Sequence, residues 1–525
     1  MTANSKRRAI ALLVGVVAAI VIGRQALHYA ADPSGDKDCS PIAPPIARAA
    51  ERLAADWPES SGVRWAQRGG GINDVSCLNP TPVDGIVDVK EVNDVSQALA
   101  FARANGLKVS IAGARHSQGG QAFAPKAVVL DMRGFKRMSL DEATRTLTVQ
   151  SGATWHDIQN TLHPRFAVKA MQSTDLFTVG GSISVNAHGM DHQAGSVGGT
   201  VRSMRVMLAD GTIHSLSRTQ EPDLFRLVVG GYGLFGIILD AEIEVTDNAI
   251  YRSGREIVDY KDFPALFKDR ILPDESYRLM YGHLSTAPQS FLQEMIVYTY
   301  KEVGARPSTI PPLDEVSGIG FRRLVFNLSK LGPLPMRLKW WAEKTLEPRL
   351  ESCPAGNTDG CLVSRNNPMH DSVPYLMNQL AGETDILHEY FIPRDQFVRF
   401  VDGLRRIALA TGANLLNASV RVVHKEDNFL SYAPADMFAV VLYLNQKTTA
   451  EGNARMATLT NQLIDLTADV GGRYFLPYQL HYTADQLRRS YPEIEAFFKA
   501  KDVYDPAHVL TNTFYEKYAP TIVRR

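Results

Sequence analysis

The sequence predicts an α+β protein of at least two domains, and three observations lead to this fold class. The chain has 525 residues, more than one typical domain contains. Residues 92–104 carry apolar side chains at helical spacing, whereas residues 237–245 alternate apolar and acidic side chains as a strand does. A hydrophobic content of 45% and a formal net charge of zero are typical of a globular body, so no nucleic acid partner is expected.

The first predicted unit is a strand, a helix, a strand and a loop of small residues. The helix of residues 92–104 ends at Asn105-Gly106, and the next strand leads into residues 112–122. These residues form a glycine-rich loop with one histidine before a further strand at residues 127–131. Small side chains let the backbone approach an anion, and successive N–H groups form a concavity that suits a pyrophosphate.

This loop resembles the flavin-binding loop of the vanillyl-alcohol-oxidase superfamily, whose FAD-binding domain is of the PCMH type. Members often attach the flavin through the histidine of a Gly-x-x-His-Ser signature, and residues 113–117 read Gly-Ala-Arg-His-Ser. Arg115 stands where several branches have glycine. The resemblance implies an FAD cofactor, covalently bound through His116, in a domain of two subdomains. The alternative is that His116 is only a surface residue in a glycine-rich turn.

Two further segments support the resemblance. Residues 171–189 contain a Thr-Val-Gly-Gly run followed by serine, similar to the second flavin segment of the family. Residues 231–236 fit the Gly-x-Gly-x-x-Gly pattern of nicotinamide-binding folds, but that pattern requires a following helix. Because residues 237–245 have strand periodicity, the glycines are interpreted as room for the backbone beside a flavin.

The last segment, residues 503–512, resembles the tail of cytokinin dehydrogenases and of aldonolactone and alditol oxidases. In those enzymes the tail returns to the flavin domain, which makes Thr511 a further candidate. The residues expected to contact FAD are Ala112, Gly113, Ala114, Arg115, His116, Ser117, Gln121, Ala122, Ser173, Thr174, Thr178, Gly180, Gly181, Ser184, Asn186, His188, Gly189, Ile237 and Asn512.

The family-like domain layout assigns each part of the chain. Residues 70–248 are the predicted FAD-binding domain, and residues 491–525 return to it. Residues 249–490 are the predicted substrate-binding cap, with an antiparallel sheet and flanking helices. Residues 1–30 are a membrane anchor or a signal segment.

The catalytic candidates lie mainly in the predicted cap. Residues 416–424 resemble the strand of sugar-acid and polyol oxidases that places an arginine over the flavin, and Arg421 takes that position. Ser419 replaces the glutamate that polyol oxidases have two residues earlier, which puts polyol oxidation in doubt. The candidates for proton abstraction are His424, Tyr478, Tyr482 and Asp175. Asp175 lies near, but out of register with, the catalytic aspartate of cytokinin dehydrogenases.

The resemblance implies oxidation of a carbon that bears a hydroxyl group, in a sugar lactone, polyol or related alcohol. The alternatives are oxidation of a CH–NH group, as in cytokinin dehydrogenases, and a flavin-binding or flavin-free protein without catalysis, tethered to a membrane. The electron acceptor is oxygen, or a membrane quinone or cytochrome. Ala153 favours a quinone or cytochrome acceptor, because in aldonolactone-oxidising relatives an alanine at the matching position obstructs the access of oxygen to the flavin.

Three features concern the environment of the chain. Lys6, Arg7 and Arg8 precede an apolar run, residues 9–23, which fits an uncleaved single-pass anchor with the body on the non-cytoplasmic side, or a cleaved secretory signal. Trp340-Trp341 beside basic residues fits a bilayer surface, or a helix packed on the body. The four cysteines fit disulfides or buried thiols equally well, and no metal site is expected.

The apolar run generates a prediction about location. If residues 9–23 are an anchor, the full-length protein will sediment with membranes and resist carbonate extraction, whereas a chain beginning near Asp32 will stay in the supernatant. Subcellular fractionation and immunoblotting measure both. Recovery of a mature chain that lacks roughly the first thirty residues would instead identify a cleaved signal.

Overall fold

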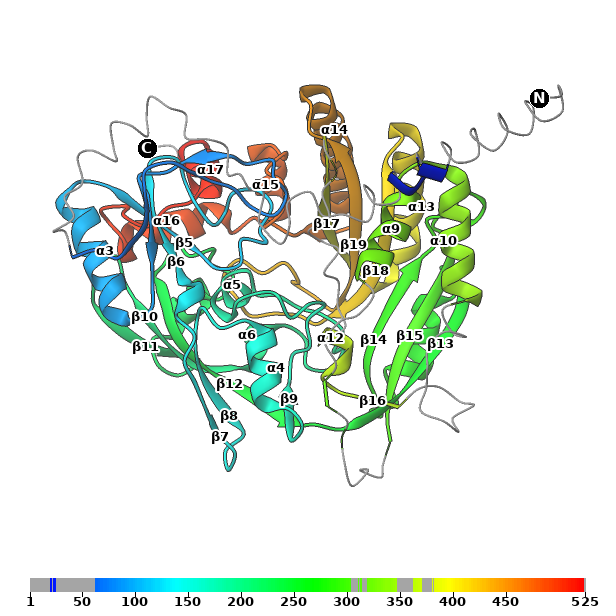
Figure 1. The fold of residues 1–525 in the computed structure, drawn as a ribbon, viewed down its shortest axis with the longest axis horizontal. Coiled ribbons are helices and arrows are strands. Elements are labelled where there is room, and N and C mark those ends of the chain that lie inside the picture. The colour runs from blue at the N-terminus through cyan, green and yellow to red at the C-terminus, as the bar shows by residue number, and fades with distance from the viewer. Residues whose placement is uncertain are drawn as a thin grey trace, which may run out of the picture.

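The computed structural model describes residues 62–303, 310, 312–313, 319–346, 362–370, 380 and 382–523, together with residues 19, 20 and 22–24. It confirms the α+β fold, with three main sheets of four, six and eight strands. Figure 1 shows the blue and cyan elements of the first two sheets on one side of the molecule and the eight-stranded sheet on the other. The red C-terminal helices lie with the blue strands.

The four-stranded sheet has the order β1-β4-β6-β5, and its last three strands run parallel. The helix α3 (Val92–Ala104) connects β4 to β5 and packs its apolar face on this sheet, which confirms the predicted helix. The strands here are β1 (Trp65–Arg68), β4 (Gly85–Asp88), β5 (Lys108–Ala112) and β6 (Ala127–Asp131), with a separate small pair, β2 (Gly71–Ile72) and β3 (Thr81–Pro82).

The six-stranded sheet has the order β11-β10-β12-β8-β7, and β9 also pairs with β12. Its strands are β7 (Met138–Asp141), β8 (Thr146–Gln150), β9 (Phe166–Val168), β10 (Val201–Met207), β11 (Ile213–Ser217) and β12 (Ile237–Asp247). Its helices are α4 (Trp155–Leu162), α5 (Val179–Val185), α6 (Val197–Thr200) and α7 (Pro222–Val228), with the short η2 (Met132–Gly134) before β7. The strand β12 confirms the strand periodicity that argued against a nicotinamide site.

The eight-stranded sheet has the order β16-β13-β15-β14-β18-β19-β17-β20, and its pairings are antiparallel. The change of sheet falls between Asp247 and Ile250, beside the boundary predicted at Asn248. The strands are β13 (Ile250–Asp259), β14 (Tyr277–Leu284), β15 (Glu294–Glu302), β16 (Leu362–Ser364), β17 (Glu383–Pro393), β18 (Asn414–Val423), β19 (Met437–Lys447) and β20 (Arg473–Tyr474).

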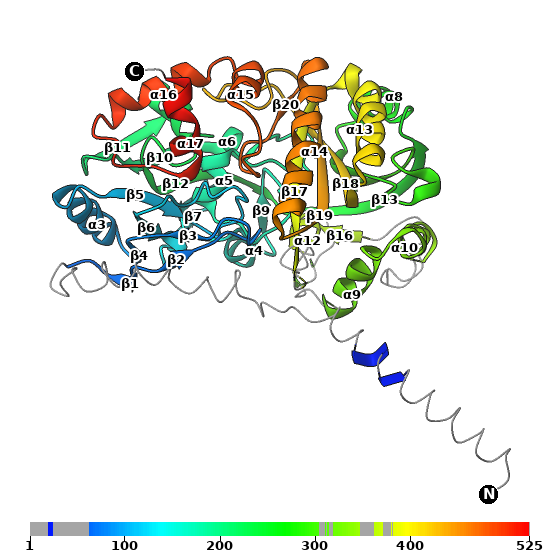
Figure 2. The same cartoon turned by 90° about the horizontal axis from the view of Figure 1, so that it is seen from above.

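Helices pack on both faces of this sheet. Two long helices cover one face, and Phe326 and Trp340 of two further helices pack on part of the face that is turned toward the first two sheets. The helices α13 (Phe397–Thr411) and α14 (Ala450–Asp469) lie against β17 and β19, as Figure 2 shows. Aromatic and aliphatic side chains of α13, such as Phe400 and Leu404, are fully buried there. The other elements of this region are α8 (Phe263–Leu266), η3 (Phe267–Ile271), η4 (Pro288–Ser290), α9 (Ile319–Ser329), α10 (Pro333–Thr345), α12 (Asn367–His370) and η6 (Arg394–Gln396).

The C-terminal tail returns to the first sheet. It contains α15 (Ala484–Ser490), α16 (Ile494–Tyr504) and α17 (Thr513–Ile522). Residues after α16 run beside β5, where the N–H of Val109 donates to the carbonyl of Val509 at 2.7 Å and the N–H of Thr511 donates to the carbonyl of Val109 at 2.8 Å. The tail therefore extends the sheet that leads into the loop of residues 112–122.

The structure bears to different extents on the three expectations about the environment of the chain. The predicted anchor, residues 9–23, lies largely outside the described residues, and among those described no helix is long and apolar enough to cross a membrane. Cys77 is disulfide-bonded, whereas Cys39, Cys353 and Cys361 lie outside the described part of the chain. In α10, Trp340 is buried and Trp341 is 55% exposed, so the Trp-Trp pair divides between the core and the surface.

A buried ion pair holds the tail in place. Lys501 and Asp505 have side chains 1% exposed, and the ammonium lies 2.6 Å from the carboxylate. The same carboxylate accepts hydrogen bonds from the N–H groups of Val509 and Leu510 at 2.9 and 2.8 Å. The ammonium also donates to the carbonyl of Leu234 at 3.0 Å. Asp505 thus fixes the residues that pair with β5.

We expect Asp505→Ala to destabilise the fold by about 3–5 kcal/mol, because it leaves a buried ammonium without its counter-ion. The matched control is Asp502→Ala on the same helix, whose carboxylate is 48% exposed and pairs with His508, and its expected cost is about 0–1 kcal/mol. Urea unfolding followed by tryptophan fluorescence measures both. Equal losses in the two variants would contradict this role of Asp505.

Candidate active site

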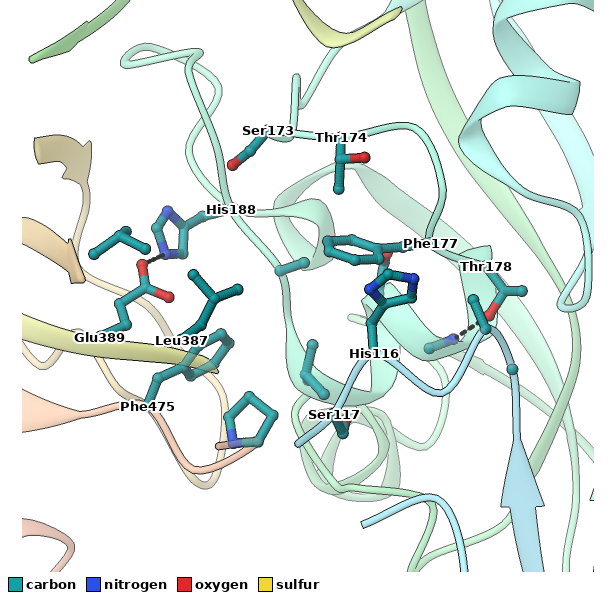
Figure 3. A pocket seen from close by; sticks show the side chains of 18 of the residues that line it. His116, Ser117, Ser173, Thr174, Phe177, Thr178, His188, Leu387, Glu389 and Phe475 are labelled. Atoms are coloured by element: carbon teal, nitrogen blue, oxygen red, sulfur yellow. Dashed lines mark hydrogen bonds and ion pairs between the residues drawn. The ribbon is translucent and has the colours of Figure 1, made fainter. Parts of the chain in front are cut away.

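A cavity of about 740 Å³ lies between the glycine-rich segments and the face of the eight-stranded sheet opposite α13 and α14. Ligand sites in proteins typically occupy roughly 300–1,000 Å³. Figure 3 shows its two ends: His116 lies beside Phe177 at one, and His188 lies against Glu389 at the other. The cavity is therefore bounded by residues from both halves of the molecule.

Close backbone packing shapes the glycine-rich wall. Arg115 has a φ of +56°, a left-handed conformation that turns the loop sharply. A Cβ atom at Gly113 would lie 2.1 Å from Thr178 Oγ1, and one at Gly180 would lie 2.7 Å from the Cβ of Ser151. Only glycine permits these approaches, so the loop and the first turn of α5 form one continuous surface.

Gln118 joins this loop to the opposite half of the molecule. Its backbone N–H donates to the carbonyl of Pro477 at 2.7 Å, and its side-chain Oε1 accepts from the N–H of Leu387 on β17 at 2.7 Å. Its own carbonyl accepts from the side-chain amide of Gln479. Gln118 is only 3% exposed, so these bonds are shielded from water.

A histidine and a carboxylate form a buried pair at the far end of the cavity. His188 Nε2 lies 2.6 Å from Glu389 Oε1, and both side chains are 4% exposed. The Tyr478 hydroxyl donates to the other carboxylate oxygen at 3.3 Å. Burial, together with the neighbouring carboxylate, raises the pKa of Tyr478 well above its usual value, so the phenol keeps its proton. Glu389 is thus held between two side chains that contribute to the cavity wall.

The strand β18 adds a polar row to the same wall. Asn417, Ser419 and Arg421 line the cavity because alternate residues of a strand face the same side. Ser419 and Glu389 are both register partners of Val441 on the intervening strand β19. They therefore lie in one cross-strand row, separated by two strand spacings, or about 10 Å.

Several buried polar atoms of this wall have no hydrogen-bond partner among the described residues. They are Nε and Nη1 of Arg421, Nδ1 of His188 and Oγ of Ser151. Burial lowers the pKa of Arg421, and the charge of Glu389 opposes this shift. Leaving such a group unpaired costs about 1–3 kcal/mol, so the wall has unused capacity to bind polar or anionic groups.

Comparison with known proteins identifies the cofactor. Residues 83–217 match a protein family described as an FAD binding domain. These residues therefore form an FAD-binding domain of the PCMH type. An uncharacterized oxidoreductase of the fasciation locus of Rhodococcoides fascians is 25% identical over 450 residues, covering 83% of this chain and 93% of that protein.

Two other relatives have named activities. Cytokinin dehydrogenase 2 of Arabidopsis thaliana is 26% identical over 453 residues, covering 81% of this chain and 87% of that enzyme. Decaprenylphosphoryl-β-D-ribose oxidase of Mycolicibacterium smegmatis is 37% identical over 169 residues, covering 31% of this chain and 37% of that enzyme. The chain is therefore an FAD-dependent oxidoreductase.

The cavity fits FAD, since closely packed glycines on one wall let a ligand approach the backbone, and buried donors of the lining lack partners among the described residues. Most residues predicted to contact FAD lie on the wall: Gly113, Ala114, Arg115, His116, Ser117, Gln121, Ala122, Ser173, Thr174, Thr178, Gly180, Gly181, Ser184 and His188. Of the catalytic candidates, Arg421 and Tyr478 lie there too. FAD supplies a hydride acceptor when bound, and these residues are the ones available to hold and orient it.

Strand alternation places two predicted FAD contacts away from the wall. Ala112 and Ile237 are buried in hydrophobic clusters, whereas their neighbours Ile111 and Ile238 line the cavity. A one-residue error in register moves a side chain to the other face of a strand. Sequence alternation alone did not say which face of β5 or β12 was turned toward the cavity.

Three other residues that were predicted to contact FAD do not line the cavity, and each has a role in the local structure. Asn186 ends α5 in a left-handed conformation, and its side chain bonds Gly198 and Glu426. A Cβ atom at Gly189 would lie 2.0 Å from the carbonyl oxygen of Met171, so this glycine permits a close chain crossing. Asn512 begins α17 and donates to the carbonyl of Tyr232.

Four further candidates also lie outside the wall. His424 follows the end of β18 and contacts the carbonyl of His192 at 2.6 Å. Tyr482 stacks on Tyr518, with ring centroids 4.7 Å apart. Ala153 is fully buried and does not contribute to the cavity, so its position gives no support to an oxygen gate. Asp175 faces two histidines, described below.

Glu389 was not among the site residues predicted from the sequence. Residues 388–393 alternate across β17, so Glu389 faces the cavity while His388 lies near Thr460 of α14. A carboxylate directly before the buried residues Tyr390, Phe391 and Ile392 was the available signal. Its partner His188 lies 201 positions away in the sequence, and only the fold brings the two together.

Proposed function

We propose that this flavoenzyme oxidises a carbon bearing a hydroxyl group, with His188 as the base that takes the hydroxyl proton. The observation that carries the proposal is the buried His188–Glu389 pair on the cavity wall. Oxidation of an alcohol requires a hydride acceptor, which FAD supplies, and a base for the proton on oxygen. The chain's own residues therefore have to bind the alcohol and hold that proton.

The arrangement of the pair favours proton uptake at His188 Nδ1. Glu389 Oε1 lies 2.6 Å from Nε2 without the alignment of a hydrogen bond, and its negative charge favours the tautomer that carries the proton on Nε2. Nδ1 then presents a lone pair, and it has no partner among the described residues. The proton leaves the substrate oxygen for Nδ1, and Glu389 stabilises the imidazolium that results.

Arg421 supplies the complementary charge. Its guanidinium is buried, faces the cavity and has two N–H groups without partners in the described chain. It is suited to stabilise negative charge that develops on the substrate oxygen as the proton departs. A fixed cation also disfavours a protonated amine substrate, which supports a hydroxyl donor over the CH–NH alternative.

Polyol oxidases have a glutamate two residues before the arginine that corresponds to Arg421, and in this chain Glu389 can take its place. Ser419 occupies its position, but Glu389 reaches the same cross-strand row from β17. The carboxylate needed to pair with a base is thus present on a different strand. Because one relative is a decaprenylphosphoryl-β-D-ribose oxidase, a sugar-like alcohol is the substrate class we propose.

Membrane association and a membrane quinone or cytochrome acceptor are part of the same proposal. Residues 9–23 form an apolar run, and apolar side chains also stand out along α10 and the turn before it. Leu331, Leu334, Leu338 and Trp341 are 55–65% exposed, with Arg337 among them. Exposed leucine and tryptophan beside basic residues suit the headgroup region of a bilayer.

We expect Glu389→Gln to lower the rate of flavin reduction by roughly 10²–10⁴-fold, because the amide no longer stabilises a protonated His188. Stopped-flow bleaching of the flavin under anaerobic conditions measures the half-reaction whatever the acceptor. The panel contains aldonolactones, alditols and aldoses, with primary and secondary amines for comparison. The matched control is Glu451→Gln, an exposed glutamate in the first turn of α14.

The outcomes separate the alternatives. Bleaching by a hydroxyl compound in the wild type and the control, with a slow Glu389→Gln reaction, supports the proposal. Bleaching by amines alone would replace it with CH–NH oxidation. Bleaching by no compound of the panel would favour a protein without this activity, and an unaffected Glu389→Gln rate would remove the pair from proton transfer.

We further propose that His116 carries FAD covalently. Its ring lies on the cavity wall, edge-on to Phe177 with centroids 5.0 Å apart. Acid-precipitated protein should remain yellow, and the flavin should be found on a tryptic peptide that contains His116. His116→Ala should release flavin into the supernatant, whereas His424→Ala, outside the cavity, should not. Release of all flavin from the wild type would contradict the linkage.

A further inference from the structure

Asp175 and two histidines form a buried cluster at the edge of the cavity. His156 lies in the first turn of α4, and His370 is the last residue of α12. Nδ1 of His156 lies 2.9 Å from Asp175 Oδ2, and Nδ1 of His370 lies 3.2 Å from the same oxygen. The members of the cluster come from three separate segments, so no local sequence pattern predicts that they meet.

The ring nitrogens of His370 are available to bind a ligand. Its side chain is 2% exposed, and neither ring nitrogen has a hydrogen-bond partner among the described residues. The 3.2 Å separation from Asp175 is thus a close approach without the alignment of a hydrogen bond. A buried imidazole with both nitrogens unsatisfied is costly, and such groups in native proteins often mark an ion or a water.

The separations match those between ligands of one metal ion. Bonds of about 2.0–2.2 Å at tetrahedral or octahedral angles place neighbouring donor atoms about 2.9–3.4 Å apart. The two measured nitrogen–oxygen distances are 2.9 and 3.2 Å, and the candidate donor atoms of the three residues lie within 4.8 Å of one another. We propose that His156, Asp175 and His370 bind a divalent transition-metal ion, for which Zn²⁺ is the probe.

The scaffold around the cluster is rigid, as a metal site requires. The N–H of His156 donates to the carbonyl of Asp175 at 2.9 Å, which joins the two segments directly. The start of α12 is held by Asn366, whose carbonyl accepts from Gln159 at 2.8 Å and whose side chain donates to the carbonyl of Phe166 at 3.0 Å. The donor atoms are therefore brought together before an ion binds.

Two imidazoles and one carboxylate define the kind of ion. This donor set suits zinc and other late first-row metals better than magnesium or calcium, which prefer oxygen ligands. Three protein ligands leave a position for water or another oxygen ligand. The His156 side chain is 35% exposed, which gives the ion a path from solvent, while His370 also belongs to the cavity wall.

The test measures metal content separately from activity. Full-length flavin-loaded protein is dialysed against EDTA, incubated with ZnCl₂, desalted and analysed by mass spectrometry for zinc. We expect about one zinc per chain in the wild type, and an increase in Kd of about 100-fold or more in His370→Ala and Asp175→Asn. The control is His214→Ala, which removes another histidine paired with a carboxylate, Glu221, at 3.0 Å. Flavin absorbance reports whether each variant remains folded.

Each outcome decides the proposal. No retained zinc in the wild type would make the cluster an electrostatic triad only, and equal retention in all variants would assign the zinc to other sites. If His370→Ala does not fold, X-ray absorption at the zinc edge of the wild type decides. Two imidazole nitrogens and an oxygen at about 2.0–2.2 Å are expected, and a shell without imidazole would overturn the assignment.

Discussion

The hydrogen bonds of Gln118 are the constraint on which the cavity depends. This one residue belongs to the loop of His116, yet it bonds the strand that carries Glu389 and the segment that carries Tyr478. Each neutral bond contributes only about 1 kcal/mol, but here the bonds fix the distance between the two walls. The polar end of the cavity and the glycine-rich end are thereby held in one geometry, shielded from water.

The two walls have different chemical characters, and each follows from its local structure. Glycines at 113 and 180 remove side chains where the loop crosses α5, which leaves backbone and small hydroxyls as the available contacts. The sheet wall instead projects every second side chain of its strands, so Arg421, Ser419 and Glu389 share one surface. The glycine-rich wall therefore suits a flat cofactor, and the sheet wall suits a polar substrate.

Burial gives the polar groups their chemical properties. Desolvation raises the pKa of Tyr478 and lowers the pKa of His283 to about 4, so both are neutral near pH 7. Among the residues of β17 and β18 that line the cavity, the charged side chains are Arg421 and Glu389. A cation and an anion in one water-poor wall interact more strongly with a substrate than they do at a surface.

The sequence by itself determined the family, the cofactor and the elements with strong patterns. The helix at residues 92–104 and the strand at residues 127–131 have the predicted bounds, since their periodicity and their stop signals are local properties. The glycine-rich loop was recognisable because only small residues allow its backbone conformation. These features depend on neighbours along the chain.

Only the tertiary structure decided which faces and which distant residues form the site. Ile238 rather than Ile237 faces the cavity, a difference that depends on how β12 is turned against its neighbours. Glu389 meets His188, and Asp175 meets His370, across 201 and 195 sequence positions. No local pattern encodes such contacts, because side-chain pairing across sheets is set by the packing of the whole chain.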